Sequence, residues 1–299
     1  MDEVDEVIAE LLEADGRLTH REIASRVGLS RSTAATRVQR LIASKQVVIR
    51  GAVHPAVLGR PALAHVSVLV QGPATPVAAM IARRDDVPFL SLTSGQHGIV
   101  AELRSPSAHA IDLAVSELRA IEGVSAVDTL TYVEVVRDVI GPVGDVIIAI
   151  DEIDRALLVG LQEDGRASYV NLAEKVGLSA GGARRRVVRL IDESVVRIGA
   201  VVRHSGRDRQ SAMGFGIRLT GGHQDVVESL KDMSSVIFVA RTLGHFDVIV
   251  TVRAFAAAQL IDALDAVRAL PGVRAVESWT HLDVVKETYA SGLESPGQP

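Results

Sequence analysis

A short segment near the amino terminus carries hydroxyl and guanidinium side chains at a spacing that suits contact with nucleic acid. Thr33, Thr36, Arg37 and Arg40 follow the spacing i, i+3, i+4, i+7, which places them on one face of a helix. Arginine can bind guanine through two hydrogen bonds, and hydroxyl groups contact bases or phosphates. The pattern predicts a helix face that can enter a DNA groove, with Arg31 at the helix start suited to a phosphate.

The charge of the chain is unevenly distributed. The 299 residues have a formal net charge of −5 and a pI near 6.0, which would argue against a nucleic-acid partner if the charge were uniform. From Arg17 to Arg50, however, eight basic residues stand against Glu22 alone. A local basic patch on an acidic protein is typical of a DNA-binding surface.

The composition excludes several classes of protein. Hydrophobic residues make up 47% and charged residues 23%, which predicts a globular protein with a buried core. The aromatic content of 3% argues against a base-stacking platform, and the absence of cysteine excludes disulfides and thiolate zinc sites. No apolar run approaches the roughly 18 residues of a membrane helix, and the start Met1-Asp2-Glu3 is acidic, so we expect a cytoplasmic protein without membrane association.

The chain consists of two copies of one unit. Asp15-Gly16-Arg17 recurs at Asp164-Gly165-Arg166, an offset of 149 residues. The same offset relates Val27-Gly28-Leu29-Ser30 to Val176-Gly177-Leu178-Ser179, and far downstream Gly123-Val124 to Gly272-Val273. This is a tandem duplication, with a junction in 138–150, where glycine and proline interrupt regular structure.

Each copy should begin with a helix-turn-helix. In the first copy Thr19, with Glu22 three residues later, predicts the start of a second helix that Gly28 ends, and Ser30 predicts the cap of a third. The apolar stripe of the third helix should be Ala34, Val38, Leu41 and Ile42, and in the second copy Ala183, Val187, Leu190 and Ile191.

The pattern then becomes strand-like and predicts the order βαββαβ of a ferredoxin-like domain, after a strand at Val47–Val53. The expected elements are Ala62–Val70, a helix near Pro76–Arg83, Phe89–Thr93, Ile99–Leu103, a helix at Ser107–Ala120 and Val124–Val136. In the second copy they are Ala212–Leu219, Gln224–Met233, Ile237–Thr242, Val248–Val252, Ala256–Leu270 and Val273–Val285.

The fold class is thus α+β, a tandem repeat of a winged-type helix-turn-helix and a ferredoxin-like domain. We expect helix-turn-helix domains at 1–50 and 150–200, ferredoxin-like domains at 51–140 and 201–289, and a flexible tail at 290–299.

The second recognition helix differs from the first. Gly181-Gly182 replaces polar residues there, which weakens base-specific contact and helix initiation, so we expect this copy to bind DNA more electrostatically and with less sequence selectivity. The predicted DNA-binding residues are Arg31, Ser32, Thr33, Thr36, Arg37, Arg40, Arg184, Arg185, Arg186 and Arg189.

These motifs resemble the Lrp/AsnC, or feast/famine, family of transcription regulators over nearly the whole chain, twice. The matching features are a helix followed by Asp-Gly-Arg, an alanine in the second helix, Val-Gly-Leu-Ser, and Arg-Val-x-Arg-Leu at 37–41 and 186–190. The resemblance implies DNA-binding helix-turn-helix domains joined to ferredoxin-like effector domains, which pair through their sheets and sense small molecules, often amino acids.

The family's Gly-x-x-Asp turn implies an effector site. The second copy has it as Gly244-His245-Phe246-Asp247, but the first has Gly95-Gln96-His97-Gly98 and lacks the acid. A carboxylate that holds a ligand ammonium would then survive only as Asp247, and the alternative is that Asp247 caps its own turn. The effector residues implied are Thr242, Leu243, Gly244, His245, Phe246 and Asp247, with Gly95 and His97.

The implied partners are double-stranded DNA and a small-molecule effector. Because fusion raises the effective concentration of complementary sheets, one chain could imitate a dimer of single-copy relatives, within a larger homo-oligomer. Pairing of matching halves from two chains is the alternative.

Two other functions remain open. Sirohaem decarboxylases resemble the same superfamily, and Arg203, His204 and Arg207 faintly match the residues that such chemistry needs. An architectural protein that compacts DNA would use the same basic helices. The sequence has no Gly-rich phosphate loop, Gly-x-Ser-x-Gly or His-Glu-x-x-His motif, so we expect no catalytic residues, metal or cofactor.

Overall fold

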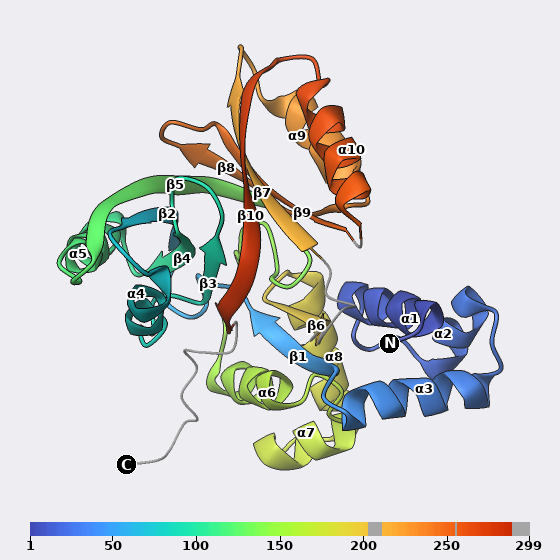
Figure 1. Ribbon diagram of the computed structural model, residues 1–299. Coiled ribbons are helices and arrows are strands. Elements are labelled where there is room, and N and C mark those ends of the chain that lie inside the picture. The colour runs from blue at the N-terminus through green and yellow to red at the C-terminus, as the bar shows by residue number, and fades with distance from the viewer. Residues whose placement is uncertain (203–210, 255, 289–299) are drawn as a thin grey trace. The chain divides into compact units, whose positions relative to one another are not determined.

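The computed structural model describes residues 1–202, 211–254 and 256–288, and these divide into two compact units. The helix-turn-helix unit comprises 1–58 and 139–202, and the barrel unit comprises 59–138 and 211–288 (Figure 1). Each unit contains one part of each sequence copy.

Three helices begin each copy, as predicted. They are α1 (Glu3–Ala14), α2 (His20–Val27) and α3 (Arg31–Ala43), and in the second copy α6 (Glu152–Glu163), α7 (Tyr169–Val176) and α8 (Ala180–Asp192). Thr19 and Glu22 form the predicted capping box of α2, and Gly28 ends that helix in the left-handed conformation at φ 68°. Ser30 caps α3 by accepting a hydrogen bond from the Thr33 amide at 3.1 Å.

A pair of strands joins the two copies in the helix-turn-helix unit. β1 (Val47–Val53) and β6 (Val196–Val202) run antiparallel, and Arg50 lies opposite Gly199, its own equivalent in the repeat. Other contacts occur in matched pairs: Gly16 N donates to Ile198 O at 2.8 Å, and Gly165 N donates to Ile49 O at 3.1 Å. The copies are therefore related by an approximate two-fold axis through the centre of this strand pair.

The helix-turn-helix unit has one shared hydrophobic core. α1 packs on β6 and α6 packs on β1, so the first helix of each copy covers the strand of the other. The cluster of buried side chains includes Ile8, Leu12, Val47, Leu157 and Val196 from both copies. Separation of the copies would expose this core to water, so burial of apolar area holds the pair together.

The ferredoxin-like order βαββαβ is present in both copies, as predicted. The first consists of β2 (Ala62–Val70), α4 (Ala74–Ile81), β3 (Phe89–Thr93), β4 (Ile99–Ser105), α5 (Ala108–Arg119) and β5 (Val124–Asp138). The second consists of β7 (Ser211–Leu219), α9 (Gln224–Asp232), β8 (Val236–Leu243), β9 (Val248–Ala254), α10 (Ala257–Arg268) and β10 (Val273–Glu287). The boundaries differ from the expected ones by one or two residues at most ends.

The two sheets close into one barrel. The strand order is β10-β3-β4-β2-β5-β8-β9-β7, so the pairs β5–β8 and β10–β3 join the copies. In each copy one face of the sheet packs against its two helices, in separate clusters around Leu103 and around Val250. The other face lines the barrel, which closure leaves without free sheet edges.

Some expectations need correction or stay open. Ile42, placed by its spacing in the apolar stripe of α3, is 38% exposed, because Ala34, Val38 and Leu41 already fill the contact with the core. Helix α8 forms with the same length as α3 despite its glycines, because Ser179 caps it. The predicted domain boundaries stay a prediction. The segment 203–210 and the tail 290–299 lie outside the described residues.

No helix of the described residues is long and apolar enough to cross a membrane.

Candidate functional sites

The recognition helices present most of the predicted DNA-binding residues to solvent. On α3 the side chains of Arg31, Ser32, Thr33, Thr36 and Arg40 are exposed, and on α8 those of Arg184, Arg185 and Arg189 are exposed. Only Arg37 and Arg186 of the predicted set are half-buried. Among the residues that the structure describes, Arg31, Arg184 and Arg185 make no ion pair, so their charges are available to an anion.

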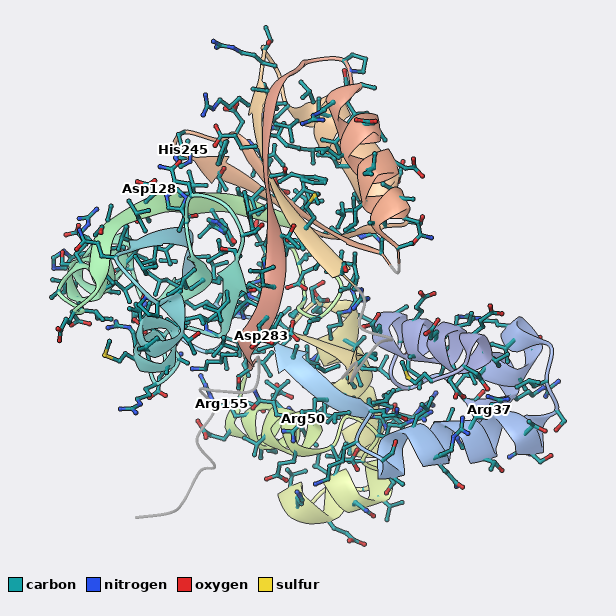
Figure 2. All side chains as sticks on the ribbon, in the orientation of Figure 1. Arg37, Arg50, Asp128, Arg155, His245 and Asp283 are labelled. Carbon is teal, nitrogen blue, oxygen red and sulfur yellow. The ribbon has the colours of Figure 1, made fainter. Side chains whose placement is uncertain are left out.

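The remaining arginines are held by carboxylates that sequence reasoning did not connect to them. Arg37 lies on α3 (Figure 2), and its Nη1 contacts Asp2 Oδ2 at 2.6 Å and Asp5 Oδ1 at 2.8 Å. Arg40 pairs with the other oxygen of Asp5. Asp2 also caps α1, because its side chain accepts a hydrogen bond from the Asp5 amide. The hydrogen bond from Arg37 is the main cause that lowers the pKa of Asp2 and, in return, raises the pKa of Arg37.

The second copy repeats this carboxylate clamp. Arg186 Nη1 contacts Asp151 Oδ2 at 2.7 Å and Asp154 Oδ1 at 2.9 Å, and Arg189 pairs with Asp154. The clamp ties the first helix of each copy to its recognition helix, so these arginines position the helix as well as carry charge. The sequence did contain a sign of these ion pairs, since both Asp pairs recur at the same 149-residue offset as the arginines.

The hydroxyl groups at the start of α3 form a local network. Ser30 Oγ lies 2.9 Å from Ser32 Oγ and 2.8 Å from Thr33 Oγ1, and Thr36 Oγ1 donates to Ser32 O at 3.1 Å. All these hydroxyls are exposed, and each can exchange its partner for a base edge or phosphate. The equivalent positions on α8 include Gly181, Gly182 and Arg185, so the second helix offers charge where the first offers hydroxyls.

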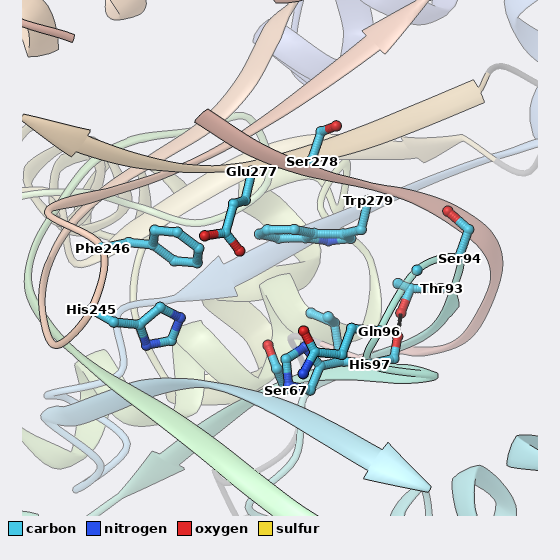
Figure 3. A pocket seen from close by; sticks show the side chains of 12 residues that line it. Ser67, Thr93, Ser94, Gln96, His97, His245, Phe246, Glu277, Ser278 and Trp279 are labelled. Carbon is cyan, nitrogen blue, oxygen red and sulfur yellow. Dashed lines mark hydrogen bonds between the residues drawn. The ribbon is translucent and has the colours of Figure 1, made fainter. Parts of the chain in front are cut away.

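A cavity of about 240 Å³ opens into the barrel between the two copies. Its walls come from Ser67 and the β3–β4 turn in the first copy, and from the β8–β9 turn and β10 in the second (Figure 3). Glu277, Ser278 and Trp279 are the contribution of β10. Aromatic rings with a few convergent polar groups are typical of small-molecule sites.

Half of the predicted effector residues line this cavity. Gly95, His97, His245 and Phe246 do so, and Thr242, Leu243, Gly244 and Asp247 do not. Asp247 Oδ2 instead accepts a hydrogen bond from the Leu219 amide at the end of β7 at 2.7 Å, which ties the β8–β9 turn to the neighbouring strand and is not a cap of the turn's own backbone. Whether Asp247 also holds a ligand stays a prediction.

Sequence reasoning missed the lining residues on β2 and β10. Trp279 is the single tryptophan of the chain, and it lies on an interior position of the barrel, where its ring centroid is 5.6 Å from that of His65. Neither Trp279 nor Ser67, the lining residue on β2, belongs to a motif, and only strand pairing brings them to the turns at 94–97 and 244–247. The difference between the copies could have pointed to this site, because Trp279 and His65 correspond to the dissimilar residues Leu130 and Gly214 in the other copy.

Two imidazoles inside the barrel are neutral near neutral pH. Burial lowers the pKa of His65 to about 3 and that of His281 to about 4. Both ring nitrogens of His281 and the Trp279 Nε1 are buried, and within the described part of the chain they have no hydrogen-bond partner. The interior therefore offers uncharged donors and acceptors.

Paired helix-turn-helix domains are typical of DNA-binding proteins, and this chain joins them to an α+β barrel that encloses a cavity. An AsnC-type helix-turn-helix domain matches residues 1–42 and 150–191, and a C-terminal dimeric alpha+beta barrel domain of an AsnC-type family matches residues 220–294.

Relatives carry the same identification. An uncharacterized HTH-type transcriptional regulator of Pyrococcus abyssi is 31% identical over 148 residues, which are 48% of this chain and 92% of that protein. The HTH-type transcriptional regulator FL11 of the same organism is 26% identical over 151 residues, 50% of this chain and 97% of that protein. The chain belongs to the Lrp/AsnC family of transcriptional regulators, in a form of about twice the length of these relatives.

A solved structure resembles nearly the whole chain. The siroheme decarboxylase NirDL superposes with a TM-score of 0.61 at 12% identity, covering 95% of this chain and 93% of that one. At this identity the likeness shows a shared fold and says nothing of the reaction. The residues Arg203, His204 and Arg207, which suggested sirohaem chemistry in the sequence, lie outside the described residues.

Proposed function

We propose that the protein is a sequence-specific regulator whose α3 and α8 contact two half-sites of one duplex. The observation that carries the proposal is the symmetric pairing of β1 with β6, which relates two helices with exposed, unpaired arginines by one two-fold axis. Such an arrangement suits half-sites about one helical turn apart, or a multiple of it.

The predicted residues take different roles in this proposal. Thr33 and Thr36 read base edges, Arg31 contacts a phosphate, and Arg184 with Arg185 grips the backbone in the second half-site. Arg37, Arg40, Arg186 and Arg189 reach DNA only by exchanging a carboxylate for a phosphate. The second half-site is therefore bound more electrostatically than the first.

We also propose that the barrel cavity binds an effector and that chains associate further into a homo-oligomer. Support for the first comes from the cavity and from the four predicted effector residues that line it. An amino acid is the effector class that the family suggests. The two halves already pair within one chain in both units, so further association would join pseudo-dimers.

The test compares a duplex selected from a random pool with its scrambled version, across a salt series. Thr33→Ala with Thr36→Ala should remove about 1–3 kcal/mol of preference for each base that is no longer read, and should leave the salt dependence unchanged. Arg184→Ala with Arg185→Ala should weaken binding to both duplexes and reduce the salt slope by about 0.9 for each phosphate that is no longer neutralised. Arg268→Ala, on the exposed surface of α10, is the control.

An intact protein that binds every duplex equally would contradict sequence-specific regulation and favour an architectural role. The sirohaem-decarboxylase alternative has its own test, since bound sirohaem gives a Soret absorbance band. A tetrapyrrole carries several carboxylates that need basic partners, and no lysine or arginine lines the cavity among the residues described. We therefore expect no Soret band from this site.

A further inference from the structure

The two copies differ at the place where a symmetric barrel would have a second cavity. Residues 149 positions apart are equivalent, so the counterpart of the cavity lies around Gly216, Gly244 and Leu130. This counterpart is filled: a Cβ on Gly244 would lie 2.3 Å from Leu130 Cδ2, and a Cβ on Gly216 would lie 2.3 Å from Phe246 Cε2. Leu130, Phe246 and Ile249 form a buried apolar cluster there.

The cavity itself is open at the same positions. A Cβ on Gly95, the equivalent of Gly244, would meet no heavy atom within 4 Å. Ser67 stands where the other copy has Gly216, and Trp279 stands where it has Leu130. The duplicated barrel has therefore kept one site open and closed the other with its own side chains.

The one acidic side chain that the structure describes in the lining of the open site is a carboxylate beside two aromatic rings. Apart from two histidines, Glu277 is the one ionisable residue among the described residues that line it, and its side chain is 58% exposed. Figure 3 shows the Glu277 carboxylate between the rings of Phe246 and Trp279. Aromatic faces next to a carboxylate attract an ammonium group through both Coulomb and cation–π interactions.

The basic side chain that contacts Glu277 is Arg218, which does not line the cavity and is already engaged by three groups. Arg218 Nη2 donates to Glu277 Oε1 at 2.5 Å, Arg218 Nε donates to His245 O at 3.1 Å, and the guanidinium lies 5.5 Å from the centre of the Phe246 ring. Arg218 occupies Oε1, so a ligand ammonium would bind the other carboxylate oxygen of Glu277. A ligand carboxylate would be repelled there, because the guanidinium is already engaged.

We propose that the barrel binds one small aromatic amine without a carboxylate per chain, with its ammonium on Glu277 and its ring against Trp279. This inference rests on the proposed effector role of the cavity and specifies the ligand. It departs from an amino acid, because the α-carboxylate is the group that the site cannot accommodate.

The test uses the fluorescence of Trp279, which reports on this cavity alone because the chain has one tryptophan. Phenethylamine and histamine are compared with phenylalanine and histidine, since the members of each pair differ only in the carboxylate. We expect both amines to change the emission saturably, calorimetry to give one site per chain, and the amino acids to bind at least about tenfold more weakly.

Two variants at equivalent positions of the repeat test whether Glu277 is the carboxylate that binds the amine. Glu277→Gln should lower the amine affinity by about tenfold. Asp128→Asn, at the equivalent carboxylate, should change it by less than about twofold, since an amide can keep the 3.1 Å contact with His97. Circular dichroism and thermal unfolding of both variants confirm that each is folded.

Three results would overturn the proposal: two sites per chain, amino acids that bind as tightly as the amines, or no response to either amine. DNA affinity of the same preparations is measured in parallel. If the intact chain does not bind DNA, the proposed regulatory function is refuted, but the result on amine binding is unaffected. Amine binding that leaves DNA affinity unchanged would refute the effector role alone.

Discussion

Asparagine in place of Asp154 should weaken the fold and strengthen the electrostatic grip on DNA at the same time. Asp154 is fully buried, and its two carboxylate oxygens bind Arg186 and Arg189 of the recognition helix α8. Asparagine keeps the shape and one acceptor but removes the charge. The two guanidinium groups would then lose their internal anion.

The expected magnitudes follow from exposure. Hydrogen bonds to charged groups contribute about 1.5–3 kcal/mol, roughly twice the neutral value. Arg186 and Arg189 are 31% and 45% exposed, so water screens both pairs. We expect the free energy of unfolding to fall by about 1–2 kcal/mol after this discount. On DNA, each phosphate gained by a released arginine should steepen the salt slope by about 0.9.

Urea unfolding and fluorescence anisotropy with a random-sequence duplex measure the two effects. Glu163→Gln is the control, because its exposed ion pair with Lys175 at 2.8 Å should contribute little to either. An unchanged unfolding free energy would show that the clamp does not exist in solution. A loss of stability with an unchanged salt slope would show that these arginines do not reach DNA.

Two further predictions concern the barrel. The native state keeps His65 neutral because its pKa is lowered from 6.5 to about 3, so only the unfolded chain takes up this proton as the pH falls below 6.5. Between pH 7 and pH 5 the unfolding free energy of the His65→Gln variant, measured by urea titration, should therefore fall by about 2 kcal/mol less than that of the wild type. The His109→Gln variant, changed at an exposed histidine, should lose as much as the wild type. If the His65→Gln variant also lost as much as the wild type, a buried neutral imidazole at position 65 would be disproved. Gly216→Ala should lower the unfolding free energy by about 1–3 kcal/mol, because the Phe246 ring occupies the space of the new methyl group. Gly222→Ala, with no atom within 4 Å, should be near neutral, and a tolerated Gly216→Ala would mean that the second site is not filled.

Local structure was predictable because it depends on neighbours in sequence. The caps at Thr19 and Ser30, the left-handed Gly28 and the strand Val47–Val53 all follow from residue type and spacing, and the structure has them where expected. Ile42 is the exception: a stripe defined by period alone does not say where the contact with the core ends.

Pairing between distant segments was less accessible. The repeat indicated that the two halves could pair, but it did not specify β1 with β6 or the closure of the barrel through β5–β8 and β10–β3. For the same reason, the residues of the two sites that lie far apart in sequence were not predicted. Arg37 was found from its own helix, whereas its partner Asp5 lies 32 residues away, and Glu277 and Trp279 reach the cavity only through strand register.

The pairing of β1 with β6, in which Arg50 lies opposite Gly199, changes how a mutation in one copy affects the protein. In an assembly of identical subunits, defective and intact polypeptides mix, and one faulty copy can disable its partner. Here both members of the pair are translated as one molecule, so dilution cannot separate them. A mutation in one recognition helix therefore always occurs beside an intact second recognition helix on the same chain.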